Sequence, residues 1–153
     1  MEQLGAIQLV TLAGEPARLD ELLRGRVAVI SLWATWCAAC RDEIPALARL
    51  QERVRDRSAL VLAIAVGEPH ERVAQLVQGQ RLPYAQLVDE GFRFADALGQ
   101  ERVPATLVID RTGRIVFSGG ALDDSALAAL RAALAEAGPP GAVGFAGSAA
   151  PAR

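Results

Sequence analysis

Two cysteines are the residues of this chain best suited to covalent chemistry. Cys37 and Cys40 are its only thiols, and they directly follow an apolar run at residues 27–33. A Cys-x-x-Cys pair between a strand-like and a helix-like segment indicates a dithiol redox site. If Cys37 begins the helix, unsatisfied N–H groups and the positive end of the helix dipole favour its thiolate. Cys37 is then the nucleophile, and Cys40, one turn further on, is the resolving cysteine.

Other uses of two cysteines require partners that the sequence does not place nearby. A structural zinc site needs four ligands, and the single histidine, His70, lies in a different predicted element. An iron–sulfur centre needs four thiolates and therefore two chains. Inert core cysteines and a copper-binding or metallochaperone module are the remaining alternatives. We expect no metal and no cofactor.

The hydrophobic pattern predicts the strands and helices that position this dithiol. Residues 27–33 and 59–66 are continuously apolar, as in strands buried on both faces. Pro45 lies inside the helix that is predicted from residue 38 to about 57 and should kink it. The other predicted elements are an N-terminal ribbon from residues 6–12 with a turn at 14–16, helices at 71–80, 92–98 and 123–137, a strand at 85–88 and a hairpin of 105–109 with 114–118.

This order of elements predicts an α/β fold with a central mixed β-sheet flanked by helices. The cysteines then fall at the carboxyl end of a central strand, where open α/β sheets place their chemistry. We expect one domain over residues 1–137. Residues 138–153 are expected to form a disordered tail, since they contain too little apolar mass to offset the entropy of ordering.

Composition excludes several classes of partner. The chain has 153 residues, of which 52% are hydrophobic and 22% charged, and its formal net charge is −2. Scattered arginines and a slightly acidic balance argue against nucleic-acid binding. No apolar run approaches the length of a membrane span, and the N-terminus has no secretory signal pattern. We therefore expect either a cytosolic protein or one whose signal or anchor is missing from this sequence, and we expect a monomer.

Two motifs together resemble a known family. They are WATWCAACRDEIP at residues 33–45 and VPATLVIDRTG at residues 103–113. The pair is similar to the thioredoxin superfamily, and more closely to the TlpA-, ResA- and CcmG-like extracytoplasmic thiol-disulfide oxidoreductases, over residues 6–137. The resemblance implies a thioredoxin-like fold with an N-terminal β-ribbon and a central αβ insertion.

The same resemblance implies roles for four more residues. Pro104 would be a cis-proline facing the dithiol, with the backbone of Val103 free to pair with an extended substrate. Trp36 would form a wall of the substrate groove. Glu43, in the pattern Cys-x-x-Cys-x-x-Glu-x-Pro, would accept the proton of Cys40, the alternative being an exposed acid in the first turns of a helix. His70 is expected to be solvent-exposed.

Departures from cytosolic thioredoxins predict the direction of the reaction. Ser31 stands where those proteins have a buried aspartate, and the chain contains no lysine, which leaves Glu43 as the candidate base. Ala38 and Ala39 supply no cation to stabilise a thiolate, so we expect a disulfide reductase rather than an oxidase. A related peroxidase is the enzymatic alternative, but Ala34 occupies the position where it requires a threonine.

The family also implies partners and a location. The substrates would be disulfide-bonded proteins, with apocytochrome c among the candidates, and the electrons would come from a membrane dithiol carrier. We expect a periplasmic or other extracytoplasmic location, with anchoring through a segment missing from this chain.

Overall fold

The structure is a computed structural model, and it describes residues 2–137. Helices and strands alternate along most of the chain. In chain order the elements are α1 (Glu2–Gly5), β1 (Gln8–Val10), β2 (Pro16–Arg18), α2 (Leu19–Leu22), β3 (Val27–Trp33), α3 (Ala38–Asp42), α4 (Ile44–Val54), β4 (Ala59–Val66), α5 (His70–Val77), β5 (Ala85–Asp89), α6 (Arg93–Leu98), β6 (Ala105–Ile109), β7 (Ile115–Gly119) and α7 (Asp124–Ala137).

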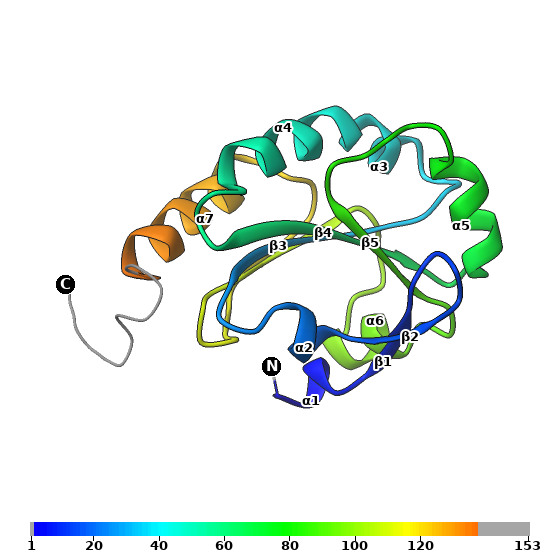
Figure 1. The fold of residues 1–153 in the computed structure, drawn as a ribbon, viewed down its shortest axis with the longest axis horizontal. Coiled ribbons are helices and arrows are strands. Elements are labelled where there is room, and N and C mark those ends of the chain that lie inside the picture. The colour runs from blue at the N-terminus through cyan, green and yellow to red at the C-terminus, as the bar shows by residue number, and fades with distance from the viewer. Residues whose placement is uncertain (1, 138–153) are drawn as a thin grey trace.

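The strands form one mixed sheet in the order β2-β1-β5-β4-β3-β6-β7 (Figure 1). β3 lies inside it, parallel to β4 and antiparallel to β6. The antiparallel pair β1 and β2 is the predicted N-terminal ribbon, and it joins the sheet through β5. The predicted αβ insertion corresponds to α5 and β5, which follow β4 and add a parallel strand to it. The predicted α/β architecture is therefore confirmed.

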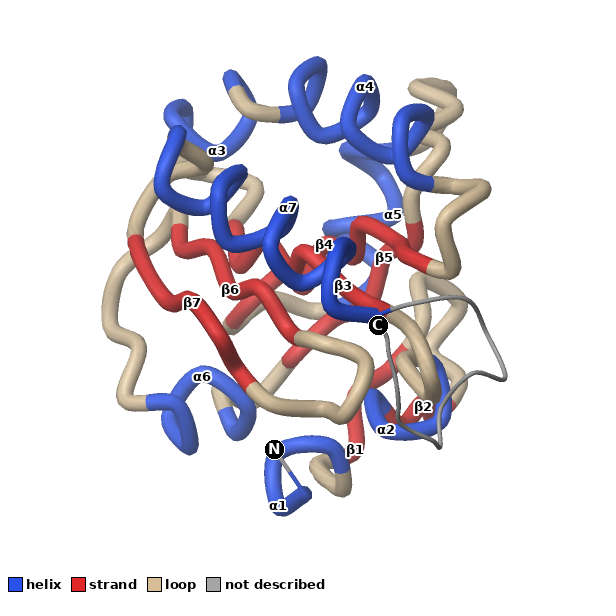
Figure 2. The backbone as a smooth tube through the Cα atoms, turned by 90° about the vertical axis from the view of Figure 1, so that its left-hand side faces the viewer, coloured by secondary structure: helices blue, strands red, loops and turns tan. Residues whose placement is uncertain are grey.

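Helices cover both faces of the sheet, as Figures 1 and 2 show. Successive side chains of a strand point to opposite faces, so a strand buried on both sides must be apolar throughout. In β3, Val27 and Val29 pack in the core under α4 and α7, whereas Ala28 and Ile30 pack in the core that includes α2 and α6. Every residue of β3 and β4 is buried. The continuously apolar runs of the sequence are thus explained by burial on two faces.

The predicted helix after the cysteines is broken rather than kinked. α3 ends at Asp42, α4 begins at Ile44, and Glu43 lies between them. Pro45 falls in the first turn of α4, where its missing N–H has no helical partner to lose. A proline that kinks the interior of a helix can therefore also begin a new one, and here the break isolates Glu43 at the junction.

Other boundaries differ by a few residues. The strand predicted at residues 6–12 is shorter, because α1 and a bend precede β1, and α1 itself was not predicted. α5 ends at Val77 rather than at residue 80. The predicted tail at residues 138–153, and with it the domain boundary after residue 137, lies outside the described residues.

Strand pairing decides which segments meet at the carboxyl end of β3. The parallel register pairs Trp33 with Ala65, so the residues that follow β3 and β4 emerge at the same edge of the sheet. The antiparallel register pairs Leu32 with Ala105, which places Pro104 beside the last residue of β3. Two segments distant in sequence, one after β4 and one before β6, therefore lie beside the Cys-x-x-Cys motif.

Candidate functional site

A disulfide joins Cys37 and Cys40 at the point where β3 passes into α3. Their Cα atoms are 5.3 Å apart. Cys37 is the N-cap of α3 in an extended conformation, and its Sγ accepts a hydrogen bond of 3.2 Å from the backbone N–H of Cys40. This is the strand-to-helix junction that the sequence predicts, with the first sulfur at the positive end of a helix.

Burial distinguishes the two cysteines only slightly. Cys37 is 7% exposed and Cys40 is 3% exposed. Both belong to the hydrophobic cluster that also contains Trp33, Leu47 and Tyr84. An attacking group can therefore reach the disulfide only over a small area, and Cys37 offers more of it than Cys40.

Trp36, Val103 and Pro104 lie at the same end of β3, as predicted. The Val103–Pro104 peptide bond is cis, which confirms the conformation expected from the second motif. Trp36 is 71% exposed and belongs to the wall of a groove of about 430 Å³. Val103 lines the same groove. A largely exposed tryptophan gains little from its own packing, which favours a contact surface over a core role.

The groove continues along residues that the sequence analysis did not predict. Phe92 and Ala95 line its apolar part, and Asp96 and Glu101 add acidic groups. Phe92 is 48% exposed and adopts a left-handed backbone with φ of 64°. Its ring lies over Gly67, where a Cβ would come within 2.0 Å of the ring. Only a glycine at position 67 leaves room for this ring.

Glu43 lies at the break between α3 and α4, and its carboxylate is only partly satisfied. Oε2 accepts a hydrogen bond of 2.7 Å from the backbone N–H of Leu122. Oε1 is buried and has no hydrogen-bond partner. Burial raises the pKa of Glu43, and the hydrogen bond from Leu122 opposes that rise. A carboxylate with one free, desolvated oxygen is suited to accepting a proton.

Tyr84 is a titratable residue that the charge of Glu43 affects. Its side chain is buried in the cluster that contains the two cysteines. Burial, together with the negative charge of Glu43, raises the pKa of Tyr84 to about 12. Glu43 therefore lies close enough to act on the apolar cluster that also contains the dithiol.

Glu68 is a second acid at this site, and the sequence analysis missed it. It is 3% exposed, and its Oε2 accepts a hydrogen bond of 2.7 Å from the backbone N–H of Thr35. Oε1 accepts a hydrogen bond from the hydroxyl of Thr35. Both carboxylate oxygens are therefore bonded to the segment that leads into Cys37. The available signal was the position of Glu68 directly after a buried parallel strand, at the edge where the cysteines also lie.

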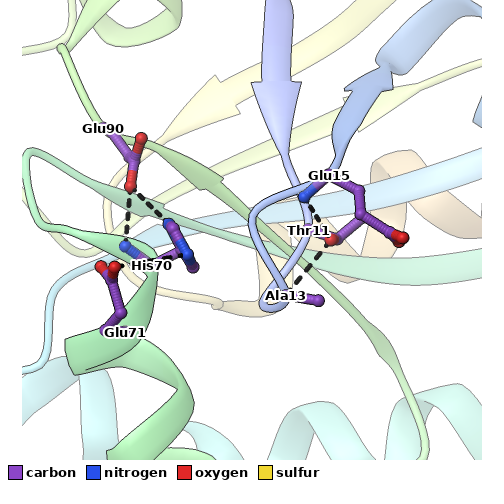
Figure 3. Close-up of polar contacts among 6 residues, drawn as sticks. All are labelled: Thr11, Ala13, Glu15, His70, Glu71 and Glu90. Atoms are coloured by element: carbon purple, nitrogen blue, oxygen red, sulfur yellow. Dashed lines mark hydrogen bonds and ion pairs between the residues drawn. The ribbon is translucent and has the colours of Figure 1, made fainter.

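His70 differs from its prediction. It was expected to be solvent-exposed, but only 24% of its side chain is exposed. Its ring faces Glu90, as Figure 3 shows, and Gly14 packs closely against the ring. The absence of a Cβ at Gly14 permits that contact, which the local sequence around His70 does not reveal.

One further observation concerns membranes. Within residues 2–137 no helix combines the length and the apolar character needed to cross a bilayer.

Comparison with known proteins identifies relatives of this chain. The chain is 30% identical over 115 residues to the thiol-disulfide oxidoreductase ResA of Halalkalibacterium halodurans, a match that covers 75% of this chain and 65% of that protein. The chain thus spans just under two thirds of the length of this relative.

Solved structures share the fold. A thiol:disulfide interchange protein of the thioredoxin family from Chlorobium tepidum superposes with a TM-score of 0.70 at 26% identity, covering 85% of this chain and 94% of that one. A secreted disulfide oxidoreductase of Mycobacterium tuberculosis gives a TM-score of 0.72 at 20% identity, with 86% and 99% covered. The thioredoxin-like fold predicted from the two motifs is confirmed.

A family profile covers most of the described chain. The AhpC/TSA family matches residues 2–118, which include the cysteine pair, both acids and the cis-proline. The chain resembles the thiol-disulfide oxidoreductase ResA, and it belongs to the AhpC/TSA family.

Proposed function

We propose that this protein is a thiol-disulfide oxidoreductase that reduces disulfide bonds of other proteins. One observation carries the proposal. The Cys37–Cys40 disulfide lies at the start of α3 with the sulfur of Cys37 accepting an N–H hydrogen bond, an environment that favours a thiolate once the disulfide is reduced. The likeness to ResA supports the same activity.

The proposed cycle transfers two electrons from the dithiol to the substrate. The thiolate of Cys37 attacks one sulfur of a substrate disulfide, that bond breaks, and the other substrate sulfur leaves and takes a proton. Cys40 then loses its proton and attacks the sulfur of Cys37. The mixed disulfide breaks, the second substrate thiol is released, and the enzyme is left as the disulfide seen here. An external dithiol donor must reduce it before the next cycle.

Glu43 is the proposed acceptor for the proton of Cys40. It lies three residues after Cys40, and its backbone N–H donates a hydrogen bond of 3.1 Å to the carbonyl of Cys40, so the two residues are one turn apart. Its free oxygen is buried, and its raised pKa brings proton exchange closer to neutral pH. Glu68 is unsuited to this role because both of its oxygens already accept hydrogen bonds from Thr35.

The groove beside the dithiol is the proposed substrate site. Trp36 and Val103 line it, and Pro104 follows directly in the chain. An extended polypeptide can lie against Trp36 and pair with the backbone of Val103 as an added strand. The substrate would therefore be an unfolded or flexible segment that contains a cystine. Apocytochrome c is one such substrate class in the family that the sequence resembles.

Partners and location follow from the same resemblance. We propose a periplasmic or other extracytoplasmic monomer that takes electrons from a membrane dithiol carrier, with membrane anchoring through a segment outside this chain.

The reaction is tested by trapping its intermediate. Replacing Cys40 by Ala removes the resolving thiol, so incubation with a disulfide-bonded test protein should accumulate a mixed disulfide through Cys37, visible by non-reducing electrophoresis and located by mass spectrometry. Cys37→Ala is the matched control and should trap nothing. Trapping by Cys37→Ala alone would reverse the two roles.

The direction is tested by the reduction potential of the dithiol. Equilibration with a glutathione or dithiothreitol buffer should give a value near about −270 mV, at the reducing end of the thioredoxin-like range. A value near about −120 mV would instead identify an oxidase.

A further inference from the structure

A second group of ligand-type side chains lies away from the dithiol. His70, Glu71 and Glu90 each offer one ligand atom, and these atoms lie within 4.8 Å of one another. Within residues 2–137 no other group of three or more His, Cys, Asp or Glu side chains is close enough to hold a metal ion. Figure 3 shows Glu90 and Glu71 near His70, which begins α5.

Glu90 makes the closest contact with the histidine. Its Oε2 lies 2.8 Å from the ring Nδ1 of His70 and accepts a hydrogen bond of 2.8 Å from the backbone N–H of the same residue. Glu90 therefore places a carboxylate oxygen directly beside one ring nitrogen of the histidine.

Glu71 lies near the other ring nitrogen. Its Oε2 lies 3.6 Å from Nε2 of His70, and its side chain is 72% exposed. An exposed glutamate can change rotamer at little cost. With a neutral imidazole, the cluster combines two negative charges with one nitrogen lone pair, and the charge balance favours a cation.

The β1–β2 turn fixes the imidazole from a third direction. A Cβ at Gly14 would lie 2.6 Å from Nε2, so the turn backbone touches the ring. The hydroxyl oxygen of Thr11 accepts hydrogen bonds from the N–H groups of Ala13 and Glu15 and holds this turn, as Figure 3 shows. The histidine ligand is thus pre-positioned by backbone rather than left free in solvent.

We propose that His70, Glu71 and Glu90 bind a divalent first-row metal ion of the zinc class, completed by water. Metal–nitrogen and metal–oxygen bonds of about 2.0–2.2 Å put neighbouring ligand atoms roughly 3–3.6 Å apart, so the cluster needs only a small closure, which Glu71 can supply. The imidazole ligand favours zinc, nickel or copper over magnesium and calcium, which take oxygen ligands.

Zinc titration of the full chain in its disulfide form tests this site. The disulfide form is required because reduced Cys37 and Cys40 would bind zinc themselves. Calorimetry should show one zinc ion per chain, and magnesium chloride should give no binding. X-ray absorption at the zinc edge should show nitrogen and oxygen ligands near about 2.0 Å and no sulfur near about 2.3 Å. Failure to saturate below about 1 mM zinc, an affinity of only about 4 kcal/mol, would overturn the proposal.

Three variants locate the ion. His70→Ala and Glu90→Gln should each weaken zinc binding at least about tenfold, since each removes one ligand. Glutamine at position 90 retains an oxygen that can accept the N–H of His70, so the start of α5 is preserved. Glu15→Gln removes a nearby exposed charge outside the cluster and should leave the affinity unchanged. Equal affinities for His70→Ala and the unsubstituted protein would show that the three residues are an ion-paired cluster and nothing more.

Discussion

Two glutamates flank the dithiol segment, and their environments differ in the way that separates a proton carrier from a structural clamp. Glu68 is almost fully buried, and both of its oxygens accept hydrogen bonds from Thr35. Glu43 is partly exposed, with one oxygen bonded to Leu122 and the other buried without a partner. A carboxylate with a hydrogen bond to each oxygen is less available for catalysis, whereas one with an unbonded oxygen can accept a proton there.

The difference arises from where each acid falls in the fold. Glu68 follows β4, whose parallel pairing with β3 delivers it to the backbone N–H of Thr35. Glu43 falls in the break between α3 and α4, where no helical geometry dictates its partners. We therefore expect substitution of Glu43 to affect mainly catalysis and substitution of Glu68 to affect mainly stability.

The largest expected effect is on catalysis, and it contrasts Glu→Gln at the two positions. Glu43→Gln removes the proposed base and should slow resolution of the mixed disulfide by about 100-fold, within the usual range for a general base. Glu68→Gln should change this rate little, because its oxygen can accept the N–H of Thr35 while its amide donates to the hydroxyl. Rapid-quench measurement of substrate release in a single turnover gives both rates.

Asp42→Asn is the control for this pair. Asp42 is an exposed acid adjacent to Glu43, so its loss changes the local charge without removing the candidate base. Its resolution rate should match that of the unsubstituted protein. Equal slowing by Asp42→Asn and Glu43→Gln would reduce Glu43 to a contributor to the local field.

The next largest effect is on stability, where loss of Glu68 should cost more than loss of Glu43. Glu68→Ala leaves the partly buried backbone N–H and hydroxyl of Thr35 without their partner and should lower the free energy of unfolding by about 2–3 kcal/mol. Glu43→Ala removes a single hydrogen bond from a partly exposed group and should cost about 1 kcal/mol. Urea unfolding of the disulfide forms measures both. A larger loss for Glu43→Ala would contradict the assignment of Glu68 as the clamp.

The contrast also explains how much of the site the sequence could predict. Cys37, Cys40 and Glu43 lie within one short segment, so spacing alone places them together. Pro104 was found through a second motif, and its cis bond is present. Glu68 and Phe92 reach the site only through strand pairing and a left-handed turn, neither of which leaves a periodic pattern. The roles of the predicted residues remain proposals.

The strands and helices were easier to predict than the breaks between them. Strands buried on both faces appear in the sequence as continuous apolar runs, and β3 and β4 match their predicted bounds. The break at Glu43 was expected as a kink because Pro45 is equally compatible with the interior of a distorted helix and the first turn of a new one. Tertiary packing decides between a kinked helix and a new helix, and the local sequence carries no information about that packing.

The smallest expected effect is a pH-dependent gain in stability from Glu43→Gln. The pKa of Glu43 is raised in the folded protein, so the folded state binds its proton more tightly than the unfolded state. Its contribution is therefore fully present below the unfolded pKa and is lost as the pH rises through the folded pKa. The neutral glutamine escapes this loss. Glu43→Gln should then be the more stable protein at pH 8, by less than about 1 kcal/mol, and the difference should vanish near pH 4. Paired urea unfolding of the two disulfide forms across this pH range measures the difference. A gap that widens on acidification would mean that Glu43 is stabilised as a carboxylate, and its proposed role as the proton acceptor would lose its physical basis.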